Sequence, residues 1–247
     1  MVVGWSTRRR QVALTAAELY RALHRGSPGD LAFYRQACAG AHHVLELGCG
    51  YGRLIEALAE PGRSLTGLDR DENLLNLARQ TQLEGANYRW LQQDMCPLDL
   101  EQRFDRILLA FNTFYCLPQD KKLPLLQGIH RHLKPGGTFV MDAYAVEKSE
   151  TVGYEQFSPP APIVTLDLPE GALDVYEESF EDYEQKTIQV TYTFRREGRV
   201  VTQQSIEHAY WYSDEFHPAL ASCGFKEIHQ FEGFGTTPTQ VVLTARR

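Results

Sequence analysis

The sequence of 247 residues lacks a hydrophobic run long enough to cross a membrane. Its longest uninterrupted apolar runs, such as residues 107–111, fall far short of the roughly 20 residues that a spanning helix needs. A basic surplus is also missing, because 25 Lys and Arg residues face 32 Asp and Glu residues, for a net charge of −7. A negatively charged surface does not attract phosphate backbones, so neither nucleic acid nor membrane is an expected partner.

Cysteine is scarce, and its spacing fits no framework of cross-links. The cysteines are Cys38, Cys49, Cys96, Cys116 and Cys223. Their number is odd, they are far apart, and no CxxC pair occurs, which argues against a disulfide framework and a structural zinc site. This usage is typical of a reducing compartment, so we expect a soluble, cytoplasmic protein.

Internal repeats and low-complexity segments are absent as well, and the apolar share of 43% fits a folded globule. The length suits one large domain or one domain with an insert. Near the N-terminus, residues 11–25 show helical spacing of apolar side chains, and residues 26–29 break the pattern. Asp30 is placed to cap a second helix over residues 31–39. We therefore expect an N-terminal helical cap over residues 1–40.

Short apolar strands then alternate with helices. The expected strands cover residues 43–47, 64–68, 88–91, 104–110 and 138–141. The expected helices cover residues 53–59, 72–79 and 123–133, the last closed by residues 134–137. Such alternation indicates βαβ crossovers and a parallel sheet covered by helices on both faces.

The pattern changes after Tyr144. Runs rich in β-branched and aromatic residues cover residues 173–180, 187–195 and 199–212, with a tight turn at residues 197–198. They predict an antiparallel β insert over residues 145–212. Ser213 offers an N-cap for a helix to about Ser222, and two final strands follow at residues 225–231 and 239–244. The expected fold is α/β: a doubly wound, seven-stranded Rossmann-like sheet over residues 41–144 and 213–247, with the insert between strand five and the last helix.

A glycine-rich turn follows the first strand, at Gly48, Gly50 and Gly52. Glycines between a strand and a helix let the backbone approach a ligand closely. A nicotinamide or flavin site would have GxGxxG, but position 53 is arginine and the spacing is GxGxG. Glu46, two residues before the glycines, would repel a pyrophosphate and suits a ligand that carries an ammonium group. Both features weigh against a nicotinamide-dependent oxidoreductase.

Acidic residues end the next two strands. Asp69 stands 21 residues after Gly48, where a carboxylate can accept hydrogen bonds from ribose hydroxyls. Asp94 follows the third strand and could accept from the exocyclic amine of adenine, with Met95 and Cys96 as soft apolar neighbours of the ring. A single acid at a strand end is usually a surface or capping group. The order of all these features on consecutive strand ends is what favours a cofactor site.

With these residues, the sequence resembles the class I S-adenosylmethionine-dependent methyltransferases, of the bacterial small-molecule type with a β insert. The matching segments are ELGCGYG (46–52), GLDR (67–70), QDMC (93–96), FDRILLAFNTFYCL (104–117) and HLKPGGTFVMD (132–142). The resemblance implies S-adenosylmethionine as cofactor. It implies a cofactor-binding set of Tyr34, Glu46, Gly48, Cys49, Gly50, Asp69, Arg70, Asp94, Met95, Ala110 and Asn112. Arg25 is a further candidate for the methionine end, while Tyr34 has the alternative of packing its helix on the sheet.

The acceptor side is less specific. Phe114 and Tyr115 follow the fourth strand and could line an acceptor pocket or belong to the core. The Pro-Pro-aromatic motif of DNA amino-methyltransferases is absent at this place. Asp142 could act as a base or metal ligand, although capping or loop anchoring is the simpler interpretation. No second ligand has convincing spacing, so no metal is expected.

The insert contributes the remaining candidates. Alternation would place His208, Tyr210 and Tyr212 on one face, which could line the acceptor pocket or hold the insert on the main domain. His208 and Tyr144 are the candidate catalytic residues, and Phe114, Tyr115 and Tyr210 are the candidate substrate-binding residues.

The leading hypothesis is an enzyme that transfers a methyl group from S-adenosylmethionine to a nitrogen or oxygen of a small molecule by in-line displacement. The alternative is a non-catalytic protein that binds the cofactor and regulates or scaffolds another process. The strand edges of the insert would allow two copies to pair as a homodimer.

Overall fold

The structure is a computed structural model that describes residues 14–83, 85–146, 148, 155–169, 171–234 and 240–247. Residues 11–13 of the first expected helix and residue 239 of the last expected strand therefore lie outside the described residues. In the part of the chain that is described, no helix has the length and apolar character needed to cross a membrane.

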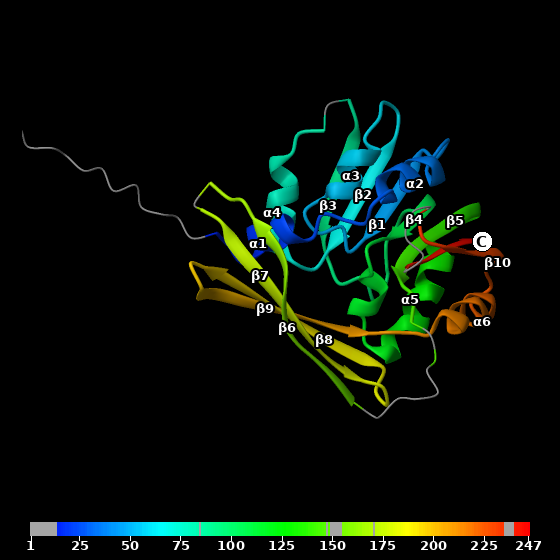
Figure 1. Cartoon of the computed structure of the whole chain (residues 1–247). Coiled ribbons are helices and arrows are strands. Elements are labelled where there is room, and N and C mark those ends of the chain that lie inside the picture. The colour runs from blue at the N-terminus through cyan, green and yellow to red at the C-terminus, as the bar shows by residue number, and fades with distance from the viewer. Residues whose placement is uncertain (1–13, 84, 147, 149–154, 170, 235–239) are drawn as a thin grey trace, which may run out of the picture.

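The main sheet has seven strands in the order β10-β11-β5-β4-β1-β2-β3, which confirms the predicted fold class (Figure 1). The strands are β1 (His43–Leu47), β2 (Ser64–Asp69), β3 (Asn87–Gln92), β4 (Phe104–Leu109), β5 (Leu133–Tyr144), β10 (Lys226–Glu232) and β11 (Gln240–Arg246). The first five are parallel, and β11 runs antiparallel to both β5 and β10. Parallel strands place all their carboxyl ends at one edge, which is where ligands bind in such sheets.

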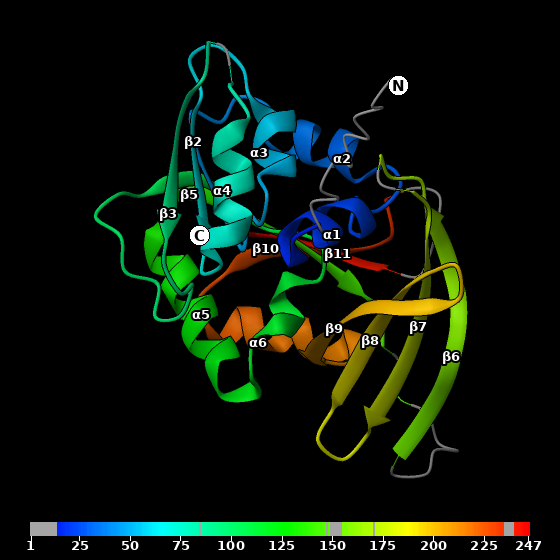
Figure 2. The ribbon, with the colours of Figure 1, turned by 90° about the vertical axis from the view of Figure 1, so that its left-hand side faces the viewer.

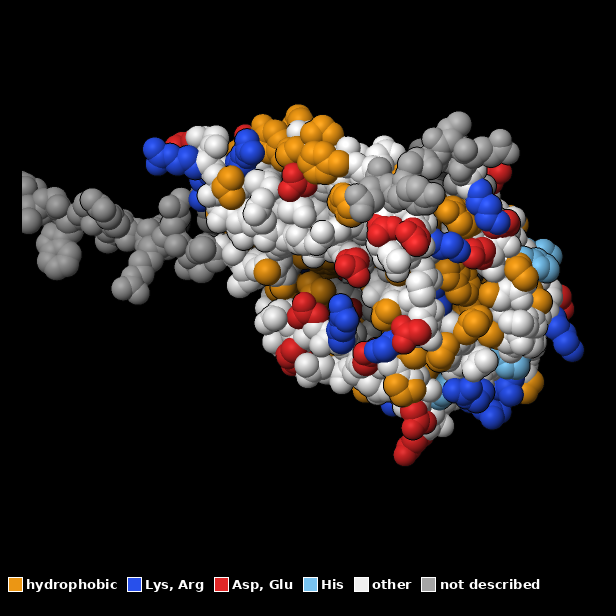
Figure 3. Space-filling view, turned by 90° about the horizontal axis from the view of Figure 1, so that it is seen from below, with side chains coloured by type: hydrophobic (Ala, Val, Ile, Leu, Met, Phe, Trp, Pro, Cys, Tyr) orange, Lys and Arg blue, Asp and Glu red, His pale blue; other side chains and the backbone are white. Residues whose placement is uncertain are grey.

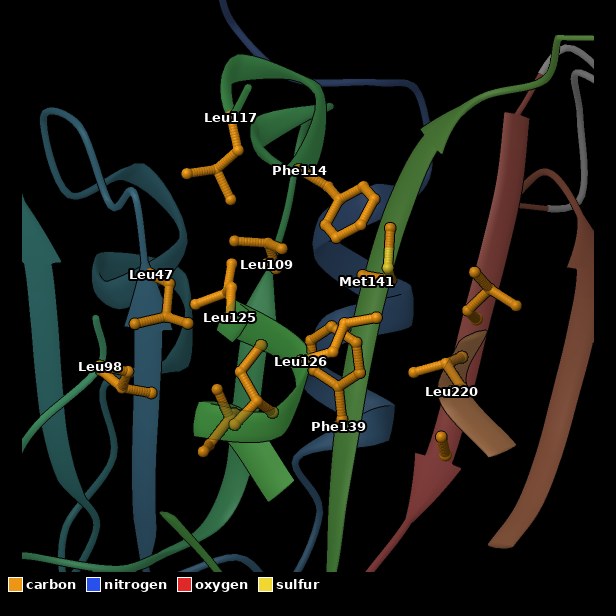
Figure 4. Packing of buried hydrophobic residues seen from close by; sticks show 14 of the residues in the cluster. Leu47, Leu98, Leu109, Phe114, Leu117, Leu125, Leu126, Phe139, Met141 and Leu220 are labelled. Atoms are coloured by element: carbon orange, nitrogen blue, oxygen red, sulfur yellow. The ribbon is translucent and has the colours of Figure 1, made fainter. Parts of the chain in front are cut away.

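Helices cover both faces of this sheet. They are α1 (Ala16–Leu23), α2 (Asp30–Ala37), α3 (Arg53–Leu58), α4 (Glu72–Gln80), α5 (Gln119–His132) and α6 (Phe216–Ser222), with 3-10 turns η1 (Thr113–Cys116) and η2 (Ser213–Glu215). Alternate strand residues such as Leu47, Leu109 and Met141 pack against α5 and α6 in one cluster, part of which Figure 4 shows. Their neighbours, such as Val44 and Leu108, pack with α2, α3 and α4 in a second cluster. The two-residue period of the strands thus produces the two-sided core.

Several boundaries differ from the sequence prediction. Helix α5 begins at Gln119 with Pro118 as its N-cap residue, and Pro124 lies inside it. The expected start at residue 123 is therefore four residues too late. Residues 134–137, expected to close the helix, belong to β5.

Two predicted N-caps are wrong. Asp30 is the first residue of α2, and Gly29 in the left-handed region is the cap residue. Ser213 starts η2, and the residue that precedes α6 is Glu215.

The insert is a four-stranded antiparallel sheet in the order β6-β7-β8-β9. Its strands are β6 (Glu155–Leu166), β7 (Leu173–Asp182), β8 (Thr187–Arg196) and β9 (Arg199–Ala209). The prediction missed β6, because its prolines read as a loop; β6 lies at the edge of the sheet and carries register shifts, where proline is tolerated. The strand β9 ends at Ala209, so the expected alternation does not extend to Tyr210 and Tyr212.

The insert sheet packs against α1, which lies between it and the main sheet in both ribbon views (Figures 1 and 2). Leu19 of α1 is buried with Leu166, Leu173, Val175 and Phe194. The Gln204 side chain donates a hydrogen bond of 2.9 Å to the carbonyl of Ala16. The insert and the N-terminal helix therefore form one connected wall beside the strand ends.

Candidate cofactor and acceptor cavity

A cavity of about 840 Å³ opens between the carboxyl ends of the main strands, α1 and β9. Its cofactor-side lining includes Gly48, Gly50, Asp69, Arg70, Asp94 and Met95, and its opposite side includes Tyr20, Tyr115, Cys116 and residues 204–207. Figure 3 shows one face of the molecule that is hollowed, with side chains of both charge signs around the hollow. The cavity thus joins the strand ends, where a cofactor is expected, to the insert.

The loop after β1 approaches its surroundings closely. A Cβ on Gly48 would lie 2.3 Å from Thr113 Cγ2, so only glycine fits beside the turn after β4. Gly50 has φ +53°, and a Cβ there would meet only Leu74 Cδ1, at 4.0 Å. The Gly48 amide also donates a hydrogen bond of 2.7 Å to the Leu68 carbonyl at the end of β2. The loop is therefore held on the sheet, and its open side at Gly50 faces space that a ligand can fill.

Asp69, at the end of β2, organises this loop. Its Oδ2 accepts a hydrogen bond of 2.7 Å from the Gly50 amide, and its Oδ1 accepts one of 2.9 Å from the Asp71 amide. Burial raises the pKa of the Asp69 carboxyl. A carboxylate has about four acceptor positions, so capacity remains for two hydroxyl donors from the cavity.

Asp94 and Met95 lie further along the same edge. Asp94 Oδ1 accepts a hydrogen bond of 3.0 Å from the Cys96 amide, and its Oδ2 lies 3.7 Å from Lys121 Nζ. Asp94, Met95 and Arg70 all line the cavity. The structure thus brings six of the expected cofactor residues together at one edge of the sheet.

Two expected cofactor residues lie beneath the glycine loop and do not line the cavity. Glu46 and Cys49 are each only 5% exposed. Burial raises the pKa of Glu46 to about 8, and its Oε2 has no hydrogen-bond partner among the described residues. An ammonium group at the loop would favour the ionised form of Glu46 and compensate its unpartnered acceptor oxygen, so this acceptor fits the methionine end of S-adenosylmethionine.

Three others serve the fold. The Tyr34 hydroxyl donates a hydrogen bond of 2.5 Å to Asp142 Oδ1 in the core, which agrees with the packing alternative for Tyr34. Burial raises the pKa of Asp142 to about 6. Ala110 is buried, and Asn112 Oδ1 accepts a hydrogen bond of 2.7 Å from the Tyr144 amide. Asn112 therefore links the turn after β4 to β5.

The two aromatic residues after β4 differ in whether they line the cavity. Tyr115 lines the cavity, and its hydroxyl lies 3.1 Å from the Tyr144 carbonyl and 3.0 Å from the Trp211 carbonyl, to which it donates. Phe114 is fully buried and packs edge-to-face on Trp211, with ring centroids 4.9 Å apart. Tyr115 is also buried, at 1% exposed, so it is a core residue that reaches the cavity, whereas Phe114 does not line the cavity.

The candidate catalytic pair lies behind Tyr115. His208 Nδ1 is 3.3 Å from the Tyr144 hydroxyl oxygen, and the His208 ring lies 6.3 Å from that of Tyr115. Burial lowers the pKa of His208 to about 4, and the nearby Lys122 contributes in the same direction. Neither His208 nor Tyr144 lines the cavity. Tyr210 is fully buried and does not line it either.

Sequence reasoning missed the far wall. Thr15, the N-cap residue of α1, and Ala16 and Ala17 of α1 line the cavity, as do several residues of β9. The sequence did carry a signal for the start of α1, because Thr15 and Glu18 have the spacing of a capping box. The structure contains this capping box, with Glu18 Oε2 2.8 Å from the Thr15 amide. Arg25 instead lines a second cavity of about 570 Å³ on the other side of α1. Of the described residues, no group of three His, Cys, Asp or Glu is placed to hold a metal ion.

Comparison with known proteins relates the segment that carries these residues to a described family. Residues 44–137, which carry the glycine loop, Asp69 and Asp94, match the family described as methyltransferase domain. Residues 44–137 therefore carry a methyltransferase domain. Among relatives of this domain, the cypemycin N-terminal methyltransferase of a Streptomyces species is 36% identical over 100 residues, which cover 40% of each chain. The ubiquinone biosynthesis O-methyltransferase of Pseudomonas aeruginosa is 36% identical over 98 residues, 38% of this chain and 40% of its own.

The chain thus matches only about 40% of the length of these curated relatives. A solved structure extends the similarity across the insert. The CcbJ methyltransferase from Streptomyces caelestis aligns with a TM-score of 0.74 at 26% identity, over 90% of this chain and 96% of its own.

Proposed function

We propose that the chain transfers the methyl group of S-adenosylmethionine to a nitrogen or oxygen atom of a small-molecule acceptor. The observation that carries this proposal is the single cavity that joins the cofactor edge to a wall made by α1 and β9. A protein that only bound the cofactor would not need the part of the cavity that α1 and β9 enclose. The similarity to the CcbJ methyltransferase over 90% of this chain supports methyl transfer as the function.

On the cofactor side, the chain binds and orients S-adenosylmethionine. The glycine loop leaves room at Gly50, Asp69 offers acceptors for the ribose hydroxyls, and Asp94 with Met95 offers an acceptor and an apolar surface for adenine. When bound, S-adenosylmethionine supplies an electrophilic methyl group on a sulfonium. The chain then needs to hold an acceptor in line with the methyl–sulfur bond and to exclude water, and such positioning accounts for much of the rate enhancement.

On the acceptor side, Tyr20, Tyr115 and the cavity-lining part of β9 are placed to orient the nucleophile. We propose the insert as the lid of this site. The transfer forms the bond from the acceptor nitrogen or oxygen to the methyl carbon, while the methyl–sulfur bond breaks and its electron pair stays on sulfur. A proton then leaves the acceptor if the acceptor arrived protonated.

His208, with Tyr144 beside it, remains our candidate for receiving that proton. Both stand behind Tyr115, so this role depends on a shift of the insert that brings the imidazole to the acceptor. His208→Gln should lower kcat and abolish the acidic limb of the pH profile, while the affinity for S-adenosylhomocysteine stays unchanged. An unaltered kcat and pH profile would remove His208 from the mechanism.

The chemistry of the acceptor atom stays open between nitrogen and oxygen. One relative is by name an N-terminal methyltransferase and another an O-methyltransferase, at equal identity. Both names are compatible with a cavity whose charged lining residues are Asp69, Asp71, Asp94, Glu207, Arg70 and Lys121. Acids outnumber bases there, which favours neutral or cationic acceptors over anions.

The test begins with calorimetric titration of the protein with S-adenosylmethionine and S-adenosylhomocysteine, with NADH as the control ligand. Binding of the sulfur ligands alone supports the cofactor assignment and justifies a screen of small amines, phenols and carboxylates for methyl transfer. Binding without turnover of any acceptor would favour the non-catalytic alternative. No binding by folded protein would overturn the proposal.

A further inference from the structure

Lys122, in the first turns of α5, is a buried lysine that does not line the cavity. Its side chain is fully buried, and its ammonium donates a hydrogen bond of 2.6 Å to the Phe114 carbonyl in η1. Among the described residues, no carboxylate lies within ion-pair distance of it. Burying an ammonium group without a carboxylate partner costs free energy. We therefore expect Lys122 to make a contribution that offsets this cost.

Aromatic rings surround this ammonium. Lys122 Nζ lies 4.2 Å from the ring centroid of Phe114, 5.4 Å from that of Tyr115 and 6.0 Å from that of Trp211. A cation over ring faces is attracted by their negative π surface, most strongly where water is excluded. Lys122 thus contacts η1, whose residues line the cavity, and Trp211 of the segment that leaves the insert.

Gln119, one turn earlier on α5, holds the same segment. Its Nε2 donates a hydrogen bond of 3.0 Å to the Tyr210 carbonyl, and its Oε1 accepts one of 2.9 Å from Trp211 Nε1. The Tyr115 hydroxyl adds its bond to the Trp211 carbonyl. Residues 210–211 follow directly on β9, whose residues 204–207 and Ala209 line the cavity.

We propose that Lys122 is a positioning residue that, together with Gln119, clamps the start of α5 and η1 to the end of β9 and so fixes the acceptor wall of the cavity. The clamp joins the two elements that flank the acceptor side, one from the methyltransferase domain and one from the insert. This inference rests on the proposed function, because that side of the cavity is an acceptor wall only if a methyl acceptor binds there.

The charge of the clamp changes near neutral pH. Burial lowers the pKa of Lys122 to about 7, against a small opposite effect of the Cys116 thiol. The titratable residues near it are Cys116 and Tyr115 from η1, the latter through its ring, and His208 from β9. Above neutral pH the amine can still donate to the Phe114 carbonyl, but the cation–π attraction is lost.

Hydrogen exchange of the whole chain tests the clamp. Lys122→Met keeps an unbranched apolar side chain but removes the charge and the donor, and Lys226→Met is the matched control on the exposed strand β10. We expect amide exchange in peptides covering residues 113–117 and 209–212 to be at least about fivefold faster in Lys122→Met and unchanged in Lys226→Met. Equal exchange in Lys122→Met and the wild type would overturn the proposal.

Gln119→Ala keeps the test decisive if Lys122→Met does not fold, because Gln119 is exposed and its loss leaves the core intact. This variant should accelerate exchange in residues 209–212, and unchanged exchange there would count against the clamp in the same way.

A spectroscopic titration separates positioning from simple packing. The emission of Trp211 should change with a midpoint close to pH 7 in the wild type and show no such transition in Lys122→Met. A Trp211→Phe variant identifies the signal. A transition that persists in Lys122→Met would assign it to another group and overturn the role of the lysine charge.

Binding of S-adenosylhomocysteine should change less than threefold in Lys122→Met, because the cofactor residues lie on the other side of the cavity. If the wild type fails to bind this ligand, the proposed function fails, whereas exchange and fluorescence still decide whether the clamp exists.

Discussion

Asp69→Ala is the most direct test of the cofactor site. The carboxylate of Asp69 already orders the Gly50 and Asp71 amides and retains acceptor capacity for two ribose hydroxyls. A hydrogen bond to a charged group contributes about 1.5–3 kcal/mol, so loss of two such bonds costs about 3–6 kcal/mol. At about 1.4 kcal/mol per decade, S-adenosylhomocysteine should bind roughly a hundredfold to ten-thousandfold more weakly.

The assay is calorimetric titration, with thermal unfolding measured on each variant without ligand. Asp69→Asn keeps one acceptor oxygen and loses the charge, so its loss of affinity should be smaller than that of Asp69→Ala. Glu72→Gln is the control, because Glu72 is a half-exposed acid close in sequence that pairs with Arg79 and does not line the cavity. A folded Asp69→Ala protein with wild-type affinity would refute the assignment of the β2 end to ribose.

Three further outcomes follow from the same structure. Gly50→Val should abolish measurable binding of S-adenosylhomocysteine in titration, because a branched side chain at φ +53° is strained and enters the open side of the loop; normal binding would exclude this loop as the cradle. Cys116 is exposed at the cavity, and desolvation raises the pKa of its thiol. Iodoacetamide should therefore label it faster as pH rises, more slowly with S-adenosylhomocysteine bound, and ahead of the buried Cys38, as read by peptide mass spectrometry; labelling that ignores the ligand would contradict the cavity. For Lys122, the folded pKa of about 7 lies below the ordinary 10.5. The unfolded chain then binds the extra proton between pH 7 and 10, so the free energy of unfolding of the wild type should rise by up to about 1.4 kcal/mol per pH unit there. Denaturant unfolding at pH 6.5 and 9 should show that Lys122→Met loses this rise, and an equal rise in both proteins would disprove it.

The cofactor edge could be predicted from local sequence because each of its parts has a local physical cause. A glycine with positive φ is needed at Gly50, and an acid at the carboxyl end of β2 or β3 meets the ligand edge of any parallel sheet. The order of strands in the chain then suffices to bring Gly50, Asp69 and Asp94 together.

The roles of the aromatic and buried acidic residues were not predictable in this way. Tyr34, Phe114 and Tyr210 have the chemistry of ligand contacts, and only packing shows that each lies in the core. The register of β9 and its end at Ala209 likewise depend on pairing with β8. No local sequence pattern indicates that β9 ends at Ala209, because the residues that follow, 210–212, are all aromatic.

The sequence by itself therefore determined the strand–helix alternation, the seven-stranded sheet and the residues at its ligand edge, since these follow from periodicity and from backbone constraints near each residue. Only the tertiary structure decided what faces that edge. The contact of α1 with the insert, the wall formed by β9 and the buried Lys122 between η1 and Trp211 all join segments that are far apart in the chain. Such contacts depend on how side chains of separate elements fill shared space, which short-range patterns do not encode.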